Sequence, residues 1–286
     1  MTAPDVRARK GTGPALAMVT AYDYTMARLA DAAGVDLILV GDSLGMVVQG
    51  LPNTLAVSLD EICYHGRAVA RGVAHAHLVG DMPFMSYQIS SAQAVESAGK
   101  LVKEGSFESV KLEGGEEMAD AVWRIVRAGI PVMGHVGLTP QSVHALGGFK
   151  VQGRGEGAAA RVVADARALE EAGAYAIVLE SVPPDLAAEV TSAVSVPTIG
   201  IGAGASCDGQ VLVCTDLLGM TPDHTPKFAK RYAELGDAIV DAMKRYVGDV
   251  RSGAFPAPEH AFKPNRTDDS AAVARLPAAR VANLRH

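Results

Sequence analysis

Residues 76–113 read AHLVGDMPFMSYQISSAQAVESAGKLVKEGSFESVKLE, which is a strand pattern, a helix pattern and a second strand pattern in succession. The strands are predicted at Ala76–Val79 and Ser109–Leu112. The helix between them is predicted to begin at the capping-box pattern Ser90-Ser91-Ala92-Gln93. Its apolar residues recur at the 3.6-residue period of one helix face, and they are Ala94, Val95, Ala98, Leu101 and Val102.

The same alternation continues along the chain on both sides of this unit. Most of the predicted strands are continuous apolar runs, as expected for parallel strands that are covered on both faces. Strict alternation of strand and helix favours a closed (β/α)8 TIM barrel, an α/β fold, over an open doubly wound sheet. The predicted strands are Leu16–Val19, Leu37–Val40, Ala76–Val79, Ser109–Leu112, Val132–Gly134, Ala176–Leu179, Pro197–Ile201 and Val211–Thr215.

The length of the chain fits one such barrel, because the chain has 286 residues and a barrel of this type typically has about 250. Hydrophobic residues make up 49% of the chain and aromatic residues only 5%, so the core is expected to be aliphatic. After Lys263 the composition changes to a mixture of Pro, Asn, Asp, Ser and Arg. We predict a single barrel domain over residues 1–263 and a poorly packed C-terminal tail over residues 264–286.

Charge and hydropathy argue against several classes of partner. The net charge of −6, with no basic cluster, disfavours nucleic acid and an electrostatic membrane anchor. The polar start Met1–Lys10 lacks the apolar centre of a secretory signal, and no apolar run approaches the roughly 18 residues of a transmembrane helix. Cys63, Cys207 and Cys214 form no Cys-x-x-Cys pair and are interpreted as reduced, packed thiols. We expect a soluble, cytoplasmic protein.

Charged residues follow the predicted strands at the end where such barrels carry their active sites. Asp42, Asp81, Glu113 and Glu180 would bring four carboxylates to one rim. Without compensation these groups would repel one another and raise each other's pKa values. A divalent cation is the simplest compensation, and oxygen ligands without a zinc-type His/Cys cluster favour Mg²⁺ or Mn²⁺. The sequence therefore predicts a metal-dependent enzyme.

Each of these residues has a plainer interpretation as well. An aspartate such as Asp42 or Asp81 after a strand can simply be the N-cap of the next helix. Lys111 lies in an apolar strand, where an unpaired ammonium group is costly, and an ion pair with Glu113 is one alternative. His135, at the end of the fifth strand, is either a site residue or a hydrogen-bonded core histidine. The joint pattern favours a site.

Two glycine-containing loops are predicted at the same rim. Gly137–Gly157 contains six glycines and no secondary-structure pattern, which is typical of a lid or a binding segment. The run Gly200–Gly204 is similar to a phosphate-binding loop, but a close backbone approach at a barrel rim explains it equally well.

In these segments the chain resembles the ketopantoate hydroxymethyltransferase family. The resemblance spans about Ala15 to Phe262, and several of its motifs are long enough to be specific. The matching stretches are Val19–Asp23, Val40–Met46, Asp81–Tyr87, Val110–Gly115, Gly134–Ser142, Gly147–Gly155, Glu180 and Ile199–Gly204. Gly80 and Met82 are mild departures, and neither is a proposed catalytic group.

The resemblance implies a barrel of the phosphoenolpyruvate/pyruvate-binding superfamily that assembles as a homodecamer. It implies the transfer of a hydroxymethyl group from 5,10-methylenetetrahydrofolate to 3-methyl-2-oxobutanoate, an α-keto acid. The product would be ketopantoate, for pantothenate and coenzyme A biosynthesis. Mg²⁺ is the implied cofactor, because chelation of the keto acid would stabilise its enolate.

The resemblance also implies a role for each site residue. Asp42, Asp81 and Glu113 match the metal site. Asp42, Ser43, Asp81 and Lys111 match the contacts to the keto acid, and Glu180 matches the catalytic proton acceptor. The alternatives are a Mg-dependent carbon–carbon lyase or aldolase acting on another α-keto acid, a Schiff-base aldolase that uses Lys111, and a non-catalytic scaffold.

Overall fold

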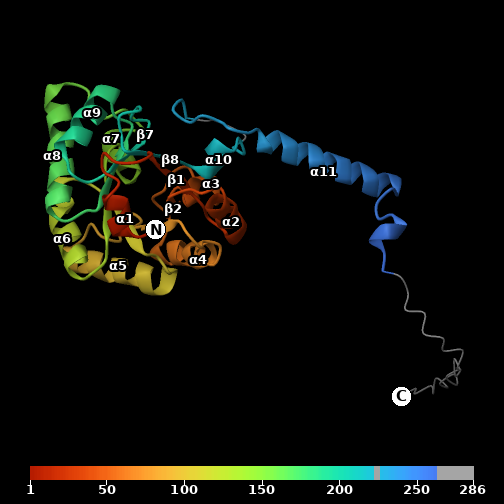
Figure 1. Ribbon diagram of the computed structural model, residues 1–286. Coiled ribbons are helices and arrows are strands. Elements are labelled where there is room, and N and C mark those ends of the chain that lie inside the picture. Colours follow the sequence, from red (N-terminus) through yellow and green to blue (C-terminus); the bar gives the residue numbers. More distant parts are fainter. Residues whose placement is uncertain (222–225, 263–286) are drawn as a thin grey trace, which may run out of the picture. The chain divides into compact units, whose positions relative to one another are not determined.

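The computed structural model describes residues 1–221 and 226–262 and contains a closed barrel of eight strands (Figure 1). Each strand pairs in parallel with the next, and β1 pairs in parallel with β8 to close the barrel. The predicted (β/α)8 architecture is confirmed. The strands are β1 (Leu16–Thr20), β2 (Leu37–Val40), β3 (His77–Asp81), β4 (Ser109–Glu113), β5 (Val132–Gly137), β6 (Ala176–Glu180), β7 (Thr198–Ile201) and β8 (Gly209–Leu212).

Helices connect consecutive strands from β1 to β7, whereas β8 follows β7 with no helix between them (Figure 1). Ser58 caps the first helix after the β2 loop in a complete capping box with Glu61, as this pattern predicts. Ser90 also accepts a hydrogen bond from Gln93 N, but the Gln93 side chain accepts from Ile89 N and not from Ser90 N. The helices are α1 (Ala3–Arg7), α2 (Tyr24–Ala32), α3 (Leu44–Val47), α4 (Leu59–Ala70), α5 (Ser91–Gly105), α6 (Ala119–Arg127), α7 (Val143–Leu146), α8 (Glu156–Glu171), α9 (Pro184–Ala193), α10 (Cys214–Leu217) and α11 (Leu235–Ser252), with 3₁₀ turns η1 (Glu116–Met118), η2 (Pro140–Ser142) and η3 (Pro258–His260).

The eighth strand differs from its prediction, Val211–Thr215. It begins at Gly209 and ends at Leu212, because Cys214 N turns away to bond Thr20 Oγ1 and starts α10. A Cβ atom at Gly209 would lie 2.7 Å from both Cβ and the carbonyl oxygen of Leu16. This close approach requires a glycine where the barrel closes. Because glycine is not typical of a strand, the sequence pattern did not predict that the strand begins there.

The strands are buried on both faces, which explains their continuous apolar runs. In β2, Leu37 and Leu39 belong to the core inside the barrel, whereas Ile38 and Val40 pack toward the helices. Ala3 and Val6 of α1 join the inner core, so this short helix closes one end of the barrel. The three cysteines are buried free thiols, as predicted.

The chain divides into two compact units, residues 1–237 and residues 238–286, and the barrel lies in the first. The second unit contains most of α11, and no side chain of α11 is buried. One domain over residues 1–263 remains a prediction, and the predicted tail 264–286 lies outside the described residues. Among the described helices, none has both the length and the apolar character needed to cross a membrane.

Candidate active site

Neighbouring strand ends bring the predicted site residues together. In the register of the barrel, Asp81 on β3 lies beside Lys111 on β4, and Glu113 on β4 lies beside His135 on β5. Glu180 ends β6, which pairs with β5. Because the strands are parallel, these residues belong to the rim that carries active sites in barrels of this type.

Lys111 is buried, and its main partner is Asp81. Its Nζ lies 2.8 Å from Asp81 Oδ1 and 3.3 Å from His135 Nδ1. The alternative of a simple ion pair with Glu113 is therefore wrong, because the neighbouring strand offers a closer carboxylate. Burial alone would lower the pKa of Lys111, but Asp81, Glu113 and Asp42 outweigh it and raise the pKa above its usual value. Lys111 is thus a fixed positive charge at the rim.

Asp42 lies directly against Asp81. Its backbone N–H donates to Asp81 Oδ2 at 3.2 Å, and its own carboxylate is buried. Burial, followed by the charge of Asp81, raises the pKa of Asp42 to about 7. The next residue, Ser43, shares a hydrogen bond of 2.8 Å between its Oγ and the hydroxyl of Tyr22. Asp42 and Ser43 are therefore held at the end of β2 by partners on β3 and on the β1 loop.

His135 lies between two carboxylates. Its Nδ1 is 3.6 Å from Glu113 Oε1, and its Nε2 is 3.3 Å from Glu180 Oε2. Burial, followed by the charge of Lys111, holds the pKa of His135 well below its ordinary value, so the imidazole is neutral. This histidine contacts the polar groups of the rim and is more than a core histidine.

Glu180 faces the rim from the side opposite Asp42 in the strand order. Burial raises its pKa to about 7, and Lys111 opposes this shift. The next residue, Ser181, has a left-handed φ of 48°, a conformation that costs energy for a residue other than glycine. At Gly137, an added Cβ would lie 2.4 Å from the Glu180 carbonyl oxygen, so the glycine allows β5 to pass close to Glu180.

Two residues that the sequence analysis did not assign connect these groups. Gln141, on η2 in the loop after β5, is buried and bonds both Asp42 and Glu113. Tyr87 is buried too and donates its hydroxyl proton to Gln141 Oε1 at 2.8 Å. The loop Gly137–Gly157, predicted to lack secondary structure, in fact contains η2 and α7. Gln141 and Tyr87 both lie in the family motifs quoted above, and nothing else in the sequence pointed to them.

The charges at this rim fit a divalent cation. Four buried or nearly buried carboxylates (Asp42, Asp81, Glu113 and Glu180) face one ammonium group and a neutral imidazole. Burial, followed by the charge of Asp42, raises the pKa of Glu113 well above its usual range. Among the described residues, no three His, Cys, Asp or Glu side chains form a ready-made metal group. The neighbouring buried residues Asp42 and Asp81 fit Mg²⁺, which commonly uses one or two carboxylates and takes its other ligands from water and substrate.

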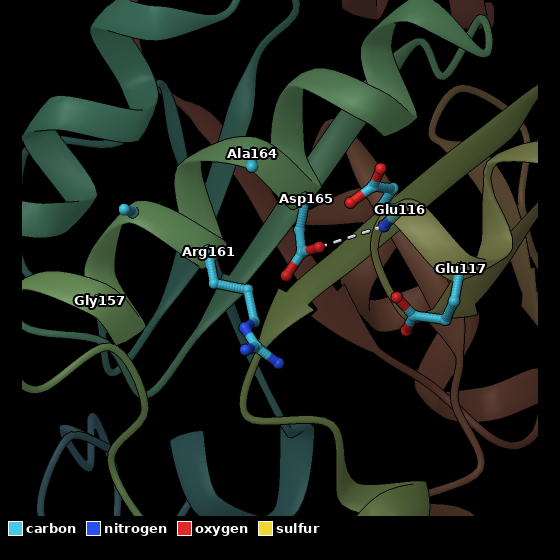
Figure 2. A pocket seen from close by; sticks show the side chains of 7 residues that line it. Glu116, Glu117, Gly157, Arg161, Ala164 and Asp165 are labelled. Carbon is cyan, nitrogen blue, oxygen red and sulfur yellow. Dashed lines mark hydrogen bonds between the residues drawn. The ribbon is translucent and has the colours of Figure 1, made fainter.

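A separate surface hollow of about 600 Å³ lies between η1 and α8 (Figure 2). In it, Asp165 accepts a hydrogen bond from Glu116 N at 3.1 Å, and Arg161 lies nearby on α8. None of its lining residues is a predicted site residue.

Comparison with known proteins identifies the family. The model of the ketopantoate hydroxymethyltransferase family matches residues 1–258. The chain belongs to this family. A 3-methyl-2-oxobutanoate hydroxymethyltransferase of Syntrophotalea carbinolica is 53% identical over 261 residues, which cover 91% of this chain and 98% of the relative. A relative of the same name from an Anaeromyxobacter species is 56% identical over 285 residues, covering 98% of this chain and 92% of the relative.

Solved structures share the fold of this family member at low identity. Phosphonopyruvate hydrolase aligns with a TM-score of 0.59 at 17% identity, over 93% of this chain and 92% of the other. A complex of that enzyme with oxalate and Mg²⁺ aligns with a TM-score of 0.58 at 18% identity, over 91% of this chain and 93% of the other. A 2,3-dimethylmalate lyase of the PEP mutase/isocitrate lyase superfamily has a TM-score of 0.58 at 16% identity, covering 90% and 92%. These matches show that the chain shares the barrel fold of these enzymes.

Membership of the ketopantoate hydroxymethyltransferase family also confirms the predicted enzyme class, a transferase. The carbon–carbon lyase alternative is not favoured, because the lyase resembles this chain in fold only. The structure brings together the residues that the sequence predicted at the site, including His135, and it adds Gln141 and Tyr87 as their direct partners.

Proposed function

We propose that this chain transfers a hydroxymethyl group from 5,10-methylenetetrahydrofolate to 3-methyl-2-oxobutanoate, giving ketopantoate for pantothenate and coenzyme A biosynthesis. One observation carries the proposal. The residues that this chemistry requires, a base and an acidic group beside a lysine, share one rim in a chain 53% to 56% identical to enzymes of that name.

In this proposal, Asp42 and Asp81 hold Mg²⁺, and Glu113 supports it from β4. Bound there, Mg²⁺ would draw electron density from the keto group and so make the C3 hydrogen more acidic. Asp42 and Asp81 suit this task because both carboxylates are buried and the charge of Asp81 acts on that of Asp42. Glu113 already accepts a hydrogen bond from Gln141 N at 3.0 Å, which supports a role behind Asp42 and Asp81.

Lys111 and Ser43 would orient the keto acid. The ammonium group of Lys111 is held by Asp81, so its charge lies at a fixed place for the substrate carboxylate or keto oxygen. Ser43 is partly exposed and can donate to a substrate oxygen while its Oγ accepts from Tyr22. A Schiff base at Lys111 is disfavoured, because a lysine that is charged and paired in this way is not a nucleophile.

Glu180 would remove the C3 proton of the keto acid. A pKa of about 7 suits a general base that works near neutral pH. The carbon nucleophile at C3 then forms a bond to the methylene carbon of the folate as one of that carbon's two bonds to nitrogen breaks, and the released nitrogen gains the proton taken from C3. Water displaces the second nitrogen and supplies the hydroxyl group of the product, and its remaining proton goes to that nitrogen as tetrahydrofolate leaves. No covalent bond to the enzyme is required.

The direct test is an assay of purified protein for ketopantoate. With 3-methyl-2-oxobutanoate, Mg²⁺ and 5,10-methylenetetrahydrofolate, we expect ketopantoate and tetrahydrofolate in equal amounts, and no ketopantoate without the folate. Cleavage of an α-keto acid or a 2-hydroxy acid without folate would instead support the lyase alternative and contradict the proposal.

We further propose that the enzyme works in the cytoplasm as a homodecamer, as the family resemblance implies. Exposed apolar side chains on α11, such as Met243 and Tyr246, support contacts with other subunits. Light scattering of the purified protein is expected to give a mass near ten chains. A monomer at micromolar concentration would show that this part of the resemblance does not apply.

A further inference from the structure

We infer that Gln141 is a positioning residue that fixes the carboxylates of Asp42 and Glu113 for the metal and the keto acid. This inference rests on the proposed function, in which these carboxylates serve the metal site. It gives the loop after β5 a part in building a site whose acidic groups lie at the ends of strands.

The side-chain amide of Gln141 makes four hydrogen bonds. Its Nε2 donates to Asp42 Oδ2 at 2.9 Å and to the Met82 carbonyl oxygen at 3.0 Å. Its Oε1 accepts from the Tyr87 hydroxyl at 2.8 Å and from Gln88 Nε2 at 3.0 Å. Two N–H donors and two lone pairs are all that a glutamine amide possesses, so the group is fully satisfied.

The chemistry of these partners fixes the orientation of the amide. The Met82 carbonyl can only accept, as can the Asp42 carboxylate in the ionised form that would bind a metal, whereas the Gln88 amide nitrogen can only donate. If the amide were flipped, its oxygen would face two acceptors in a buried place, and its nitrogen would face a donor. Gln141 therefore has one stable orientation, and that orientation presents a donor to Asp42.

The backbone of the same residue holds a second carboxylate. Gln141 N donates to Glu113 Oε2 at 3.0 Å. Asp42 follows β2 and Glu113 ends β4, so one loop residue fixes the positions of acidic groups from two different strands. A metal site requires carboxylates of fixed direction. Residues that hydrogen-bond a metal ligand without binding the metal, here called outer partners, set the direction of the ligand oxygens.

Tyr87 holds Gln141 in turn. Its hydroxyl lies 2.8 Å from Gln141 Oε1, and it also accepts from Glu113 N at 3.1 Å. The Glu113 carbonyl oxygen is a second possible acceptor at 3.1 Å, but a hydroxyl has one proton, and the shorter contact to Gln141 takes it. Tyr87, Gln141 and Glu113 thus form a closed set of hydrogen bonds, and Tyr87 would act on Asp42 only through Gln141.

The test uses Gln141→Met, which keeps the length of the side chain and the backbone N–H but removes all four side-chain hydrogen bonds. The probe is Mn²⁺ alone, titrated into the protein and followed by the electron paramagnetic resonance signal of the free ion. We expect Mn²⁺ affinity to fall about 10- to 100-fold, as is typical when an outer partner of a metal ligand is lost. In turnover, the Mg²⁺ concentration for half-maximal rate should rise by the same factor, with the folate KM nearly unchanged.

Gln49→Met is the matched control. The exposed Gln49 also donates from its Nε2 to a carboxylate oxygen, that of Glu61, at 2.6 Å, and it contacts no site residue. This variant should bind Mn²⁺ as the wild type does. Equal Mn²⁺ affinity in Gln141→Met and wild type would overturn the inference.

Tyr87→Phe keeps the inference testable if Gln141→Met does not fold. It removes the hydroxyl that bonds Gln141 and Glu113 N, and the loss of the neutral hydrogen bond to Gln141 predicts about two- to tenfold weaker Mn²⁺ binding. Wild-type Mn²⁺ affinity in a folded Tyr87→Phe protein would contradict the inference. If the wild type itself binds no Mn²⁺ and forms no ketopantoate, the proposed function fails first, and the two failures are thereby distinguished.

Discussion

The Glu180→Gln variant is expected to lose about 10²- to 10⁴-fold in kcat, because general-base catalysis typically contributes a factor of that size. Glutamine keeps the shape and the hydrogen-bonding capacity of the side chain but cannot accept the proton. The affinity for the keto acid should change little, because Asp42, Asp81 and Lys111 would supply most of the binding contacts from other strands.

Exchange of the C3 hydrogen with deuterated water, followed by NMR without folate, separates proton removal from carbon–carbon bond formation. In Glu180→Gln this exchange should fall in parallel with kcat. Glu189→Gln, an exposed position on α9, is the matched control and should exchange at the wild-type rate. If Glu180→Gln also exchanges at the wild-type rate, another group is the base, and His135 is the first candidate because it lies 3.3 Å from Glu180.

The same residue predicts the pH dependence of the reaction. Burial raises the pKa of Glu180 to about 7, so the protonated, inactive form predominates below that pH. We expect kcat/KM at saturating Mg²⁺ to be half-maximal near pH 7, to level off about one unit above it, and to fall about tenfold for each further pH unit on the acid side. The remaining activity of Glu180→Gln should lack this acid limb, and a limb that persists in the variant would assign it to another group.

Removal of the metal is expected to abolish activity, and the Asp81→Asn variant should need far more Mg²⁺. EDTA should stop turnover, and excess Mg²⁺ should restore it. Asp81→Asn removes the charge of a proposed metal ligand. It also removes the carboxylate that lies 2.8 Å from the Lys111 ammonium group in the wild type, so the buried ammonium group loses its partner. The Mg²⁺ concentration for half-maximal rate should rise by more than the roughly 10- to 100-fold typical of losing an outer partner.

Asp120→Asn is the control for this experiment. Asp120 is exposed on α6 and pairs with Arg124 at 3.1 Å, so it also loses an ion pair but lies outside the site. Its requirement for Mg²⁺ should match that of the wild type. Full activity of the wild type in excess chelator would contradict the metal-dependent mechanism as a whole.

Local patterns determined most of the fold. The continuous apolar runs predicted the strands because parallel strands buried on both faces have no polar side. β2 at Leu37–Val40 has the same bounds in the structure as in the prediction. The eighth strand was misplaced because Gly209 is selected by its close approach to Leu16 across the closed barrel, and Leu16 lies far away in the sequence.

The residue types at the strand ends also predicted the site. Acidic groups at Asp42, Asp81 and Glu113 follow predicted strands, and the strand order of a barrel then brings them to one rim. The family motifs supplied the proposed roles, including that of Glu180. Each of these predictions needs only the position of a residue relative to its own strand.

Only the tertiary structure decided which groups touch. The sequence offered Glu113 as the partner of Lys111, but the register of β3 against β4 places Asp81 closer. The sequence did not decide whether His135 is a site residue or a core histidine. Packing places its imidazole, which burial keeps neutral, between two carboxylates. The sequence assigned no role to Gln141, because a loop glutamine has no periodicity. Its role comes from four hydrogen bonds to residues distant along the chain, and such contacts exist only after the barrel has closed.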